Sequence, residues 1–238
     1  MYIYQLDKSF VFPPDSAALA EGLLAIGGDL HPDRLIKAYS QGIFPWYEED
    51  QPILWWSPDP RMVLKPNQII ISKSLRKIIR EQQFEIKMDT RFSEVIQACG
   101  TSMRNGANDT WITSELKQSF IQLHEKELAH SVEAYQNGIL VGGLYGLSIG
   151  SIFFGESMFF KVSNASKVAF TYLCNFLNEN NFDLIDAQQD TSHLRSLGAN
   201  TISRTRFLKL LKEYTIKPSL IGKWNTNSCK SELLDLNL

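Results

Sequence analysis

The sequence contains little cysteine and no clustered set of metal-binding side chains. Its three cysteines are far apart in the chain, with no CxxC pair and no even-numbered disulfide framework. This usage favours a reducing compartment, so we expect a cytoplasmic protein. The four histidines are also scattered, and none belongs to an HExxH pattern, so a zinc site is not expected.

Long apolar runs, export signals and nucleotide-binding loops are absent as well. No run reaches the ~18 consecutive apolar residues of a membrane span, and the first residues, MYIYQLDKSFVFPP, lack the pattern of a secretory signal. There is no GxxxxGK(S/T) phosphate loop, no GxGxxG fingerprint and no GxSxG elbow. The apolar fraction of 44% suits a globular protein with a core, and we expect no membrane partner.

The charge of the chain is nearly balanced, with a formal net charge of −2, which does not indicate a nucleic-acid binder as a whole. One segment, ISKSLRKIIREQQ, is locally basic. In a helix, Lys73, Arg76, Lys77 and Arg80 would fall on one side at spacings of three and four. Such a face can bind a nucleic-acid backbone, or it can simply be a solvated helix surface.

Composition divides the chain near residue 62. Residues 1–62 hold most of the prolines and three of the five tryptophans, so we expect a small N-terminal domain there and a larger domain over residues 63–238. In the first part, HPDRLIKAYSQG predicts a helix that starts at Pro32 and stops before Gly42. The following IFPWYEEDQPILWWSPDPR is rich in proline and tryptophan, and we expect it to be irregular.

The larger part alternates between helical and strand patterns. Asn137-Gly138 between two apolar runs is a strong hairpin signal, and a third antiparallel strand follows. A meander followed by helix, strand and helix makes an α+β domain with an antiparallel-rich sheet and packed helices. The expected helices are 72–80, 91–99, 113–126, one capped by Ser163 or Asn164, and 203–214 capped by Ser203; the expected strands are 130–135, 139–146, 151–161 and 182–188.

One glutamate stands among apolar residues in the stretch SIFFGESMFFK, residues 151–161. With a period of two, Glu156 shares a strand face with Phe154 and Met158. An ionised carboxylate on an apolar face is costly unless it is hydrogen-bonded or paired, which makes Glu156 a candidate site residue. The alternative is an exposed glutamate where the strand ends or bulges at Gly155.

Two polar residues end the strand in DLIDAQQD. With the same period, Asp186 and Gln188 project from one face and can touch the same ligand, while Ile185 and Ala187 take the other face. The alternative is a polar strand end that faces water.

Tryptophan is concentrated in three short segments. Trp46 follows a proline, Trp55 and Trp56 are adjacent, and Trp111 stands in DTWIT. Single-stranded nucleic-acid ends bind by stacking bases on such rings, with about 1–3 kcal/mol per base. Tryptophan serves more often as core, and both interpretations remain open at this point.

Several chemically unusual motifs occur along the chain, namely GLLAIGGDL, GIFPWY, PILWWSPDPRMVL, TWIT, AHSVEAY, LVGGLYG, FFGESMF, NASK, LIDAQ and SLGA. In this order and spacing they resemble the leucyl/phenylalanyl-tRNA–protein transferases from about residue 10 to residue 208. The resemblance covers nearly the whole chain.

This resemblance implies an aminoacyltransferase. Such enzymes move leucine or phenylalanine, and more weakly methionine, from its tRNA to the N-terminal α-amine of a protein that begins with arginine or lysine. The added residue marks that protein for degradation by the N-degron route. The family's larger domain has an acetyltransferase-like (GNAT-like) fold and its reaction uses no metal or coenzyme, and we expect this chain to act as a monomer.

The family pattern also implies roles for particular residues of this chain. Trp46 and Trp111 would flank the terminal adenosine of the tRNA, and the basic helix would meet the tRNA backbone. Glu156, Asp186 and Gln188 would form the polar catalytic centre. The apolar pocket for the amino acid would be lined by Phe153, Met158, Phe170 and Ile185.

The chain departs from the family pattern at three places, and at one of them Phe160-Lys161 replaces a more usual Ser-Arg pair. Ala187 stands where cysteine is common, which points away from covalent cysteine catalysis, and Leu144 stands where methionine is common. Three other functions compete: an acyl-CoA N-acetyltransferase, an RNA-binding module without catalysis, and a peptidoglycan-type aminoacyl transferase. The first requires a glycine-rich pyrophosphate turn before a helix, and the corresponding turn here, KVSNASK, contains no glycine.

Overall fold

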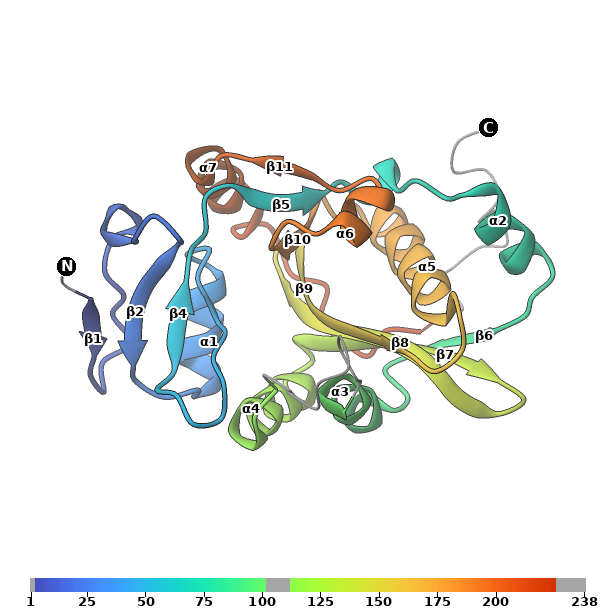
Figure 1. The fold of residues 1–238 in the computed structure, drawn as a ribbon, viewed down its shortest axis with the longest axis horizontal. Coiled ribbons are helices and arrows are strands. Elements are labelled where there is room, and N and C mark those ends of the chain that lie inside the picture. The colour runs from blue at the N-terminus through green and yellow to red at the C-terminus, as the bar shows by residue number, and fades with distance from the viewer. Residues whose placement is uncertain (1–2, 102–111, 226–238) are drawn as a thin grey trace.

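The computed structural model describes residues 3–101 and 112–225, which form two β-sheets and a set of α-helices (Figure 1). The smaller sheet consists, in spatial order, of β1 (Tyr4–Leu6), β2 (Leu23–Gly27), β4 (Leu54–Trp56) and β3 (Phe44–Pro45). The larger sheet consists, in spatial order, of β11 (Asn200–Ile202), β5 (Arg61–Leu64), β10 (Leu184–Gln188), β9 (Ile152–Phe160), β8 (Ile139–Ile149), β7 (Ala129–Gln136) and β6 (Glu85–Met88). The helices are α1 (Pro32–Tyr39), α2 (Lys73–Arg80), α3 (Phe92–Thr101), α4 (Ser114–Glu125), α5 (Ala165–Glu179), α6 (Ser192–Ser196) and α7 (Arg204–Tyr214), with short 3-10 turns at Asp15–Ala17 and Pro66–Gln68.

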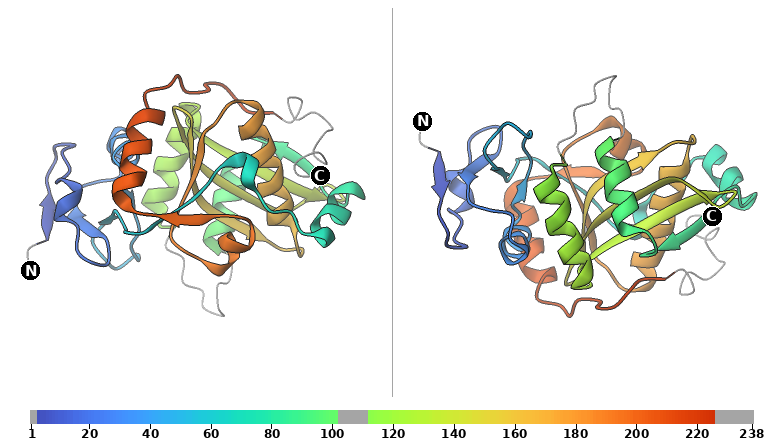
Figure 2. Two further views of the ribbon diagram at one scale, coloured as in Figure 1. Left: turned by 90° about the horizontal axis from the view of Figure 1, so that it is seen from above. Right: turned by 90° about the horizontal axis from the view of Figure 1, so that it is seen from below.

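Helices cover both faces of the larger sheet. α5 packs on one face, against β7, β8 and β9, while α3 and α4 pack on the opposite face (Figure 2). β10 runs parallel to β9 because α5 crosses over between them, and the other strand pairs of this sheet are antiparallel. The α+β class expected from the sequence is therefore confirmed.

Local sequence signals account for most elements of the larger part. The hairpin between β7 and β8 turns at Asn137 and Gly138, whose φ angles of 53° and 75° fit the predicted two-residue turn. In α4, the predicted stripe of Leu116, Phe120 and Leu123 is fully buried. These matches follow because turn chemistry and helical periodicity act over only a few residues.

The ends of two helices show where local rules hold and where they fail. The Ser203 hydroxyl accepts a hydrogen bond from the backbone N–H of Arg206, so the predicted cap of α7 is confirmed. Asn164 occupies the N-cap position of α5 as expected, but its φ of 68° is left-handed and its side chain makes no capping bond. Capping requires the extended conformation that directs the side chain to the next turn.

The prediction that IFPWYEEDQPILWWSPDPR is irregular is wrong, because this segment contains the strands β3 and β4. Residues of β3 pair antiparallel with β4, Phe44 opposite Trp56 and Pro45 opposite Trp55. Pro45 is tolerated because β3 lies at the edge of the smaller sheet. Trp55 is completely buried and donates its indole N–H to the carbonyl oxygen of Gly27, so tryptophan here builds the sheet.

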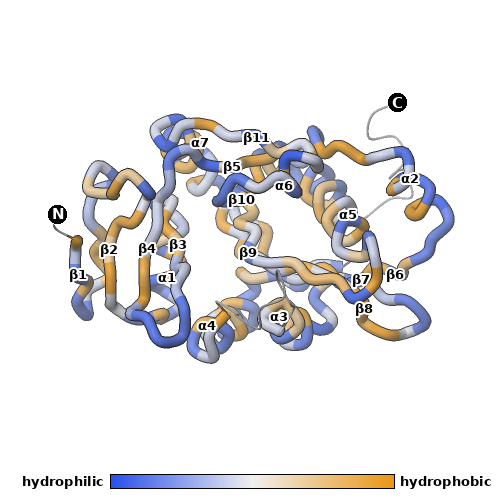
Figure 3. Tube along the Cα trace, in the orientation of Figure 1, coloured by the Kyte–Doolittle hydropathy of each residue, from blue (hydrophilic) through white to orange (hydrophobic). Residues whose placement is uncertain are grey.

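Two apolar clusters fill the space on the two sides of the larger sheet. The first includes Leu35, Phe120 and Phe154, and it joins α1 and the smaller sheet to α3, α4 and β9 in one core. The second lies under α5 and includes Trp224, whose ring stacks on His130 with centroids 3.8 Å apart. Figure 3 shows much of the trace of the central strands β8 and β9 in hydrophobic colours.

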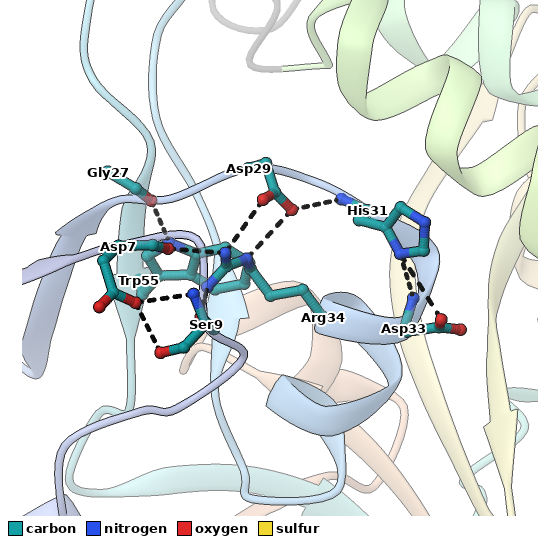
Figure 4. Close-up of polar contacts among 8 residues, drawn as sticks. All are labelled: Asp7, Ser9, Gly27, Asp29, His31, Asp33, Arg34 and Trp55. Atoms are coloured by element: carbon teal, nitrogen blue, oxygen red, sulfur yellow. Dashed lines mark hydrogen bonds and ion pairs between the residues drawn. The ribbon is translucent and has the colours of Figure 1, made fainter.

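Arg34, a fully buried residue of α1, ties the first strand to the helix (Figure 4). Its guanidinium donates two hydrogen bonds to the Asp29 carboxylate, at 3.1 and 3.0 Å. It also donates to the carbonyl oxygens of Ser9 at 2.7 Å and Asp7 at 2.8 Å. A buried guanidinium needs these acceptors, since an unpaired charge in a core is costly.

We expect Arg34→Met to lower the free energy of unfolding by about 2–3 kcal/mol, because Asp29 and two backbone carbonyls lose their charged donor. Because Asp29 is half-exposed, we expect the loss of stability to lie near the lower end of the range for buried ion pairs. Urea unfolding measures the change. Lys37→Met, at an exposed position of the same helix, is the matched control and should change stability by less than about 0.5 kcal/mol.

Candidate active site

A β-bulge sets the position of Glu156 in β9. The register of the β8–β9 pairing shifts next to Gly155, which lies opposite Gly146, and Glu156 is the extra residue. The bulge reverses the alternation of side chains, so Phe154 packs in the first apolar cluster and Met158 packs against the second. The prediction that Phe154, Glu156 and Met158 share one face is therefore wrong, because a period of two holds only within an unbroken ladder.

Glu156 is half-buried at this bulge and is hydrogen-bonded. Its Oε1 accepts a bond from the Tyr39 hydroxyl at 2.7 Å and one from the Gln188 side-chain amide at 2.9 Å. Burial raises the pKa of Glu156 to about 7, and the hydrogen bonds from Tyr39 and Gln188 oppose this rise. The bulge considered from sequence is confirmed, but the exposed glutamate is not, and this carboxyl can exchange a proton near neutral pH.

Asp186 is completely buried and forms an ion pair with Arg61. The guanidinium donates from Nε to Oδ1 at 2.8 Å and from Nη2 to Oδ2 at 2.6 Å, a two-bond arrangement. Oδ1 accepts a further hydrogen bond from the backbone N–H of Gln188 at 3.0 Å. Asp186 therefore acts on the site through the groups it holds, since both carboxylate oxygens are occupied.

Arg61 was not identified from the sequence, although it organises the centre. Besides Asp186, it donates from Nη1 to the carbonyl oxygen of Gly42 at 3.0 Å. Its guanidinium lies over the rings of Phe44 and Phe207, 4.8 and 4.6 Å from their centroids. The signal available in the sequence was an arginine that opens the apolar strand RMVL, a position where an unpaired charge would be costly.

Gln188 has a left-handed backbone, with φ of 60°, at a register shift in β10. A non-glycine residue in this conformation stores strain and is often part of a functional site. The shift directs the Gln188 side chain to Glu156 and its backbone N–H to Asp186. The structure thus joins Asp186 and Gln188 through the main chain of Gln188, across a register shift that breaks the period of two from which a shared face was predicted.

The four residues expected to line an amino-acid pocket lie in one apolar cluster. Phe153, Phe170 and Ile185 are buried in the cluster under α5, and Met158 is partly buried against it. They come from α5 and from β9 and β10, the two strands that carry Glu156 and Gln188. Phe153, Phe170 and Ile185 are at most 5% exposed, so the cluster is closed in this structure and stays a prediction as an amino-acid pocket.

Of the two tryptophans expected to flank an adenosine, Trp46 is 39% exposed, directly after β3. Its ring is tilted against that of Trp56, with centroids 5.9 Å apart, and the Trp56 indole N–H donates to the Trp46 carbonyl oxygen at 2.7 Å. The sequence did not lead us to expect that Trp56 supports the ring of Trp46. Trp111 lies outside the described residues.

The basic residues of ISKSLRKIIREQQ form α2, as predicted, and this helix lies at the end of the molecule opposite the smaller sheet (Figure 1). Lys73, Lys77 and Arg80 are exposed, and Arg76 is half-buried. The helix therefore offers a charged face to solvent, far along the molecule from Trp46.

Two further properties concern the described part of the chain. Within residues 3–101 and 112–225, no three His, Cys, Asp or Glu side chains are grouped so that they could hold a metal ion. No helix there has the length and apolar character that crossing a membrane requires.

Sequence comparison shows which known proteins this chain resembles. A family model described as leucyl/phenylalanyl-tRNA protein transferase matches residues 63–212, and a model of that family's N-terminal domain matches residues 28–59. A leucyl/phenylalanyl-tRNA–protein transferase of Desulfatibacillum aliphaticivorans is 49% identical over 228 residues, covering 96% of this chain and 98% of its own. Proteins of the same description from Syntrophus aciditrophicus, 50% identical, and Azotobacter vinelandii, 53% identical, cover 95% and 89% of this chain and 95% and 94% of their own.

We expect Arg61→Met to lower the free energy of unfolding by about 3–5 kcal/mol, because it leaves Asp186 charged, buried and unpaired. Urea unfolding measures the loss. The double variant Arg61→Met with Asp186→Leu removes both charges and should recover most of the stability. A double variant as unstable as the single one would show that the ion pair is not the source of the effect.

Stability should also depend on pH through Glu156. The ordinary pKa of 4.5 applies to the unfolded chain, and the folded pKa is about 7, so the folded state holds the proton more tightly. This contribution is complete below about pH 4.5 and is lost as the pH rises through about 7. We therefore expect the unfolding free energy of Glu156→Gln minus that of the wild type to increase from about pH 4.5 to about pH 7, as measured by urea titrations. A difference independent of pH would contradict the raised pKa.

Proposed function

The chain belongs to the leucyl/phenylalanyl-tRNA protein transferase family, and from this premise we propose which amino acids it moves and to which proteins. It is an aminoacyltransferase that takes an aminoacyl group from tRNA and gives it to a protein. The donors are leucyl-tRNA and phenylalanyl-tRNA, with methionyl-tRNA weaker. The acceptors are proteins that begin with arginine or lysine, which the added residue marks for N-degron degradation.

The observation that carries this proposal is the position of the polar centre. Glu156 and Gln188 lie on β9 and β10, the strands that also carry Phe153 and Ile185 of an apolar cluster suited to a leucine or phenylalanine side chain, and Glu156 is bonded to Tyr39, which shortly precedes Trp46 in the chain. An aminoacyl ester needs both an apolar slot for its side chain and a stacking surface for its terminal adenosine. We also propose that the protein works as a cytoplasmic monomer without metal or coenzyme.

The chemistry itself makes modest demands. The acceptor amine attacks the ester carbonyl, an amide bond forms, and the ester bond to the 3′-oxygen of the tRNA breaks. An α-amine with a pKa near 8 is only about one-tenth neutral at pH 7, and only the neutral form attacks. Alignment of the two substrates supplies ~7–11 kcal/mol of the barrier reduction, and a base adds about 10²–10⁴ in rate.

The residues of the centre divide this work. Gln188 positions the amine or the ester carbonyl with its side-chain amide, which already donates to Glu156. Asp186, held by Arg61, orients Gln188 through the backbone N–H. Trp46 receives the adenosine, and the charged face of α2 meets the tRNA backbone, since Lys73, Lys77 and Arg80 are exposed.

A transfer assay tests the proposal. We expect leucine from leucyl-tRNA to be added to a peptide that begins with arginine and not to one that begins with alanine, detected by mass spectrometry. Gln188→Ala should lower the rate at least about tenfold, and Gln189→Ala, an exposed neighbour, should leave it unchanged.

Each other outcome has a definite meaning. Equal addition to both peptides would contradict the acceptor selectivity, and addition to neither would favour a non-catalytic RNA-binding module. Binding of acetyl-CoA in calorimetry, without transfer from tRNA, would favour the acetyltransferase alternative.

A further inference from the structure

Tyr39 reaches the polar centre from outside the strands that build it. It is the last residue of α1, is completely buried, and donates its hydroxyl to Glu156 Oε1 at 2.7 Å. Its ring packs edge-on against Phe120 and Phe154, with centroids 6.4 and 5.3 Å away. A ring held this firmly presents its hydroxyl in one direction, and the roles assigned above do not use it.

We propose that Tyr39 is a positioning residue that holds the Glu156 carboxylate so that Oε2 accepts the proton of the attacking α-amine. Oε1 already accepts from Tyr39 and from the Gln188 amide, and no hydrogen bond from a described residue reaches Oε2. The inference rests on the proposed function, and it identifies the acceptor's amine as the group that Glu156 meets.

The proton and electron pairs balance in this step. The neutral amine forms its bond to the ester carbonyl, and the Glu156 carboxylate takes the proton that the nitrogen then releases. The bond to the 3′-oxygen of the tRNA breaks, and that oxygen receives the proton from Glu156. The enzyme ends the cycle as a carboxylate, ready for the next amine.

The surroundings of Glu156 suit a proton acceptor. Burial raises the pKa of Glu156 to about 7, close to that of an α-amine, whereas an ordinary carboxylate would be too weak a base. The charged and titratable groups that face it are Tyr39 on α1, Asp186 on β10 and Arg61 on β5. Tyr145 on β8 faces Tyr39, and burial beside Glu156 keeps the pKa of Tyr39 well above its ordinary value, so Tyr39 stays a donor.

The same segment links the proton acceptor to the proposed tRNA surface. After Tyr39 the chain passes Gly42, whose carbonyl oxygen accepts from Arg61, and Phe44, whose ring stacks on Arg61. Trp46 follows two residues later. An adenosine on Trp46 and the carboxylate of Glu156 are therefore placed by one short stretch of chain.

Tyr39→Phe tests the role of the hydroxyl, because the ring and its packing remain. Removal of a bond that lowers the Glu156 pKa should move the acid limb of the pH profile of leucine transfer upward by about 0.5–1 unit. The titration of the peptide amine is common to both enzymes and cancels in the comparison. We expect kcat at pH 7 to fall about 2–5-fold, because less Glu156 is then ionised, with little change in KM for leucyl-tRNA.

Tyr47→Phe is the matched control, since Tyr47 is also buried in the N-terminal part and its hydroxyl contacts Thr113 and not Glu156. It should leave the acid limb in place. Glu156→Gln should lose the limb near pH 7 and reduce kcat by about 10²–10⁴. An unshifted profile in Tyr39→Phe, or a Glu156→Gln enzyme with full turnover, would overturn the inference.

A second measurement separates this inference from the proposed function. Urea unfolding from about pH 4.5 to about pH 8 reports the folded pKa of Glu156 without any substrate. Tyr39→Phe should shift the midpoint of that pH dependence upward, and an unshifted midpoint overturns the inference whether or not leucine is transferred. A wild-type protein that transfers no leucine would contradict the proposed function and, with it, the catalytic part of this inference.

Discussion

The buried ion pair between Arg61 and Asp186 is the interaction on which the centre of this protein depends. Two charges can be removed from water only where each is paired and its remaining hydrogen-bonding atoms are satisfied. Arg61 meets this condition by binding Asp186, the carbonyl oxygen of Gly42 and two aromatic rings. The pair therefore fixes β5, β10, α7 and the segment after α1 relative to one another, and the rest of the site is assembled on that frame.

This frame separates the tasks of two acidic residues. Asp186 is fully engaged by a guanidinium and a backbone N–H, so it holds other groups in place. No cation among the described residues forms an ion pair with Glu156, and burial brings the pKa of Glu156 to about 7. Their environments differ: burial raises the pKa of Glu156, and Arg61 binds both carboxylate oxygens of Asp186, as is common where two carboxyl groups of one site take different roles.

Much of the larger part could be predicted from sequence. The Asn137-Gly138 turn, the stripe on α4 and the Ser203 cap are set by neighbours within a few residues, and all appear in the structure. The predictions that failed concern pairing between distant segments. β3 and β4 form because Trp55 and Pro45 meet in a sheet, and the faces of β9 exchange because the β8 partner forces a bulge.

The sequence by itself determined which chemical groups are present and most of the local elements: a glutamate among phenylalanines, an aspartate and a glutamine at a strand end, a basic helix and several tryptophans. Only the tertiary structure decided which of them touch. Arg61 and Asp186 are separated by 125 residues and Tyr39 and Glu156 by 117, and no short-range pattern reports a contact at such distances. Burial, which sets the cost of each charge and the pKa of Glu156, exists only once these distant segments have packed together.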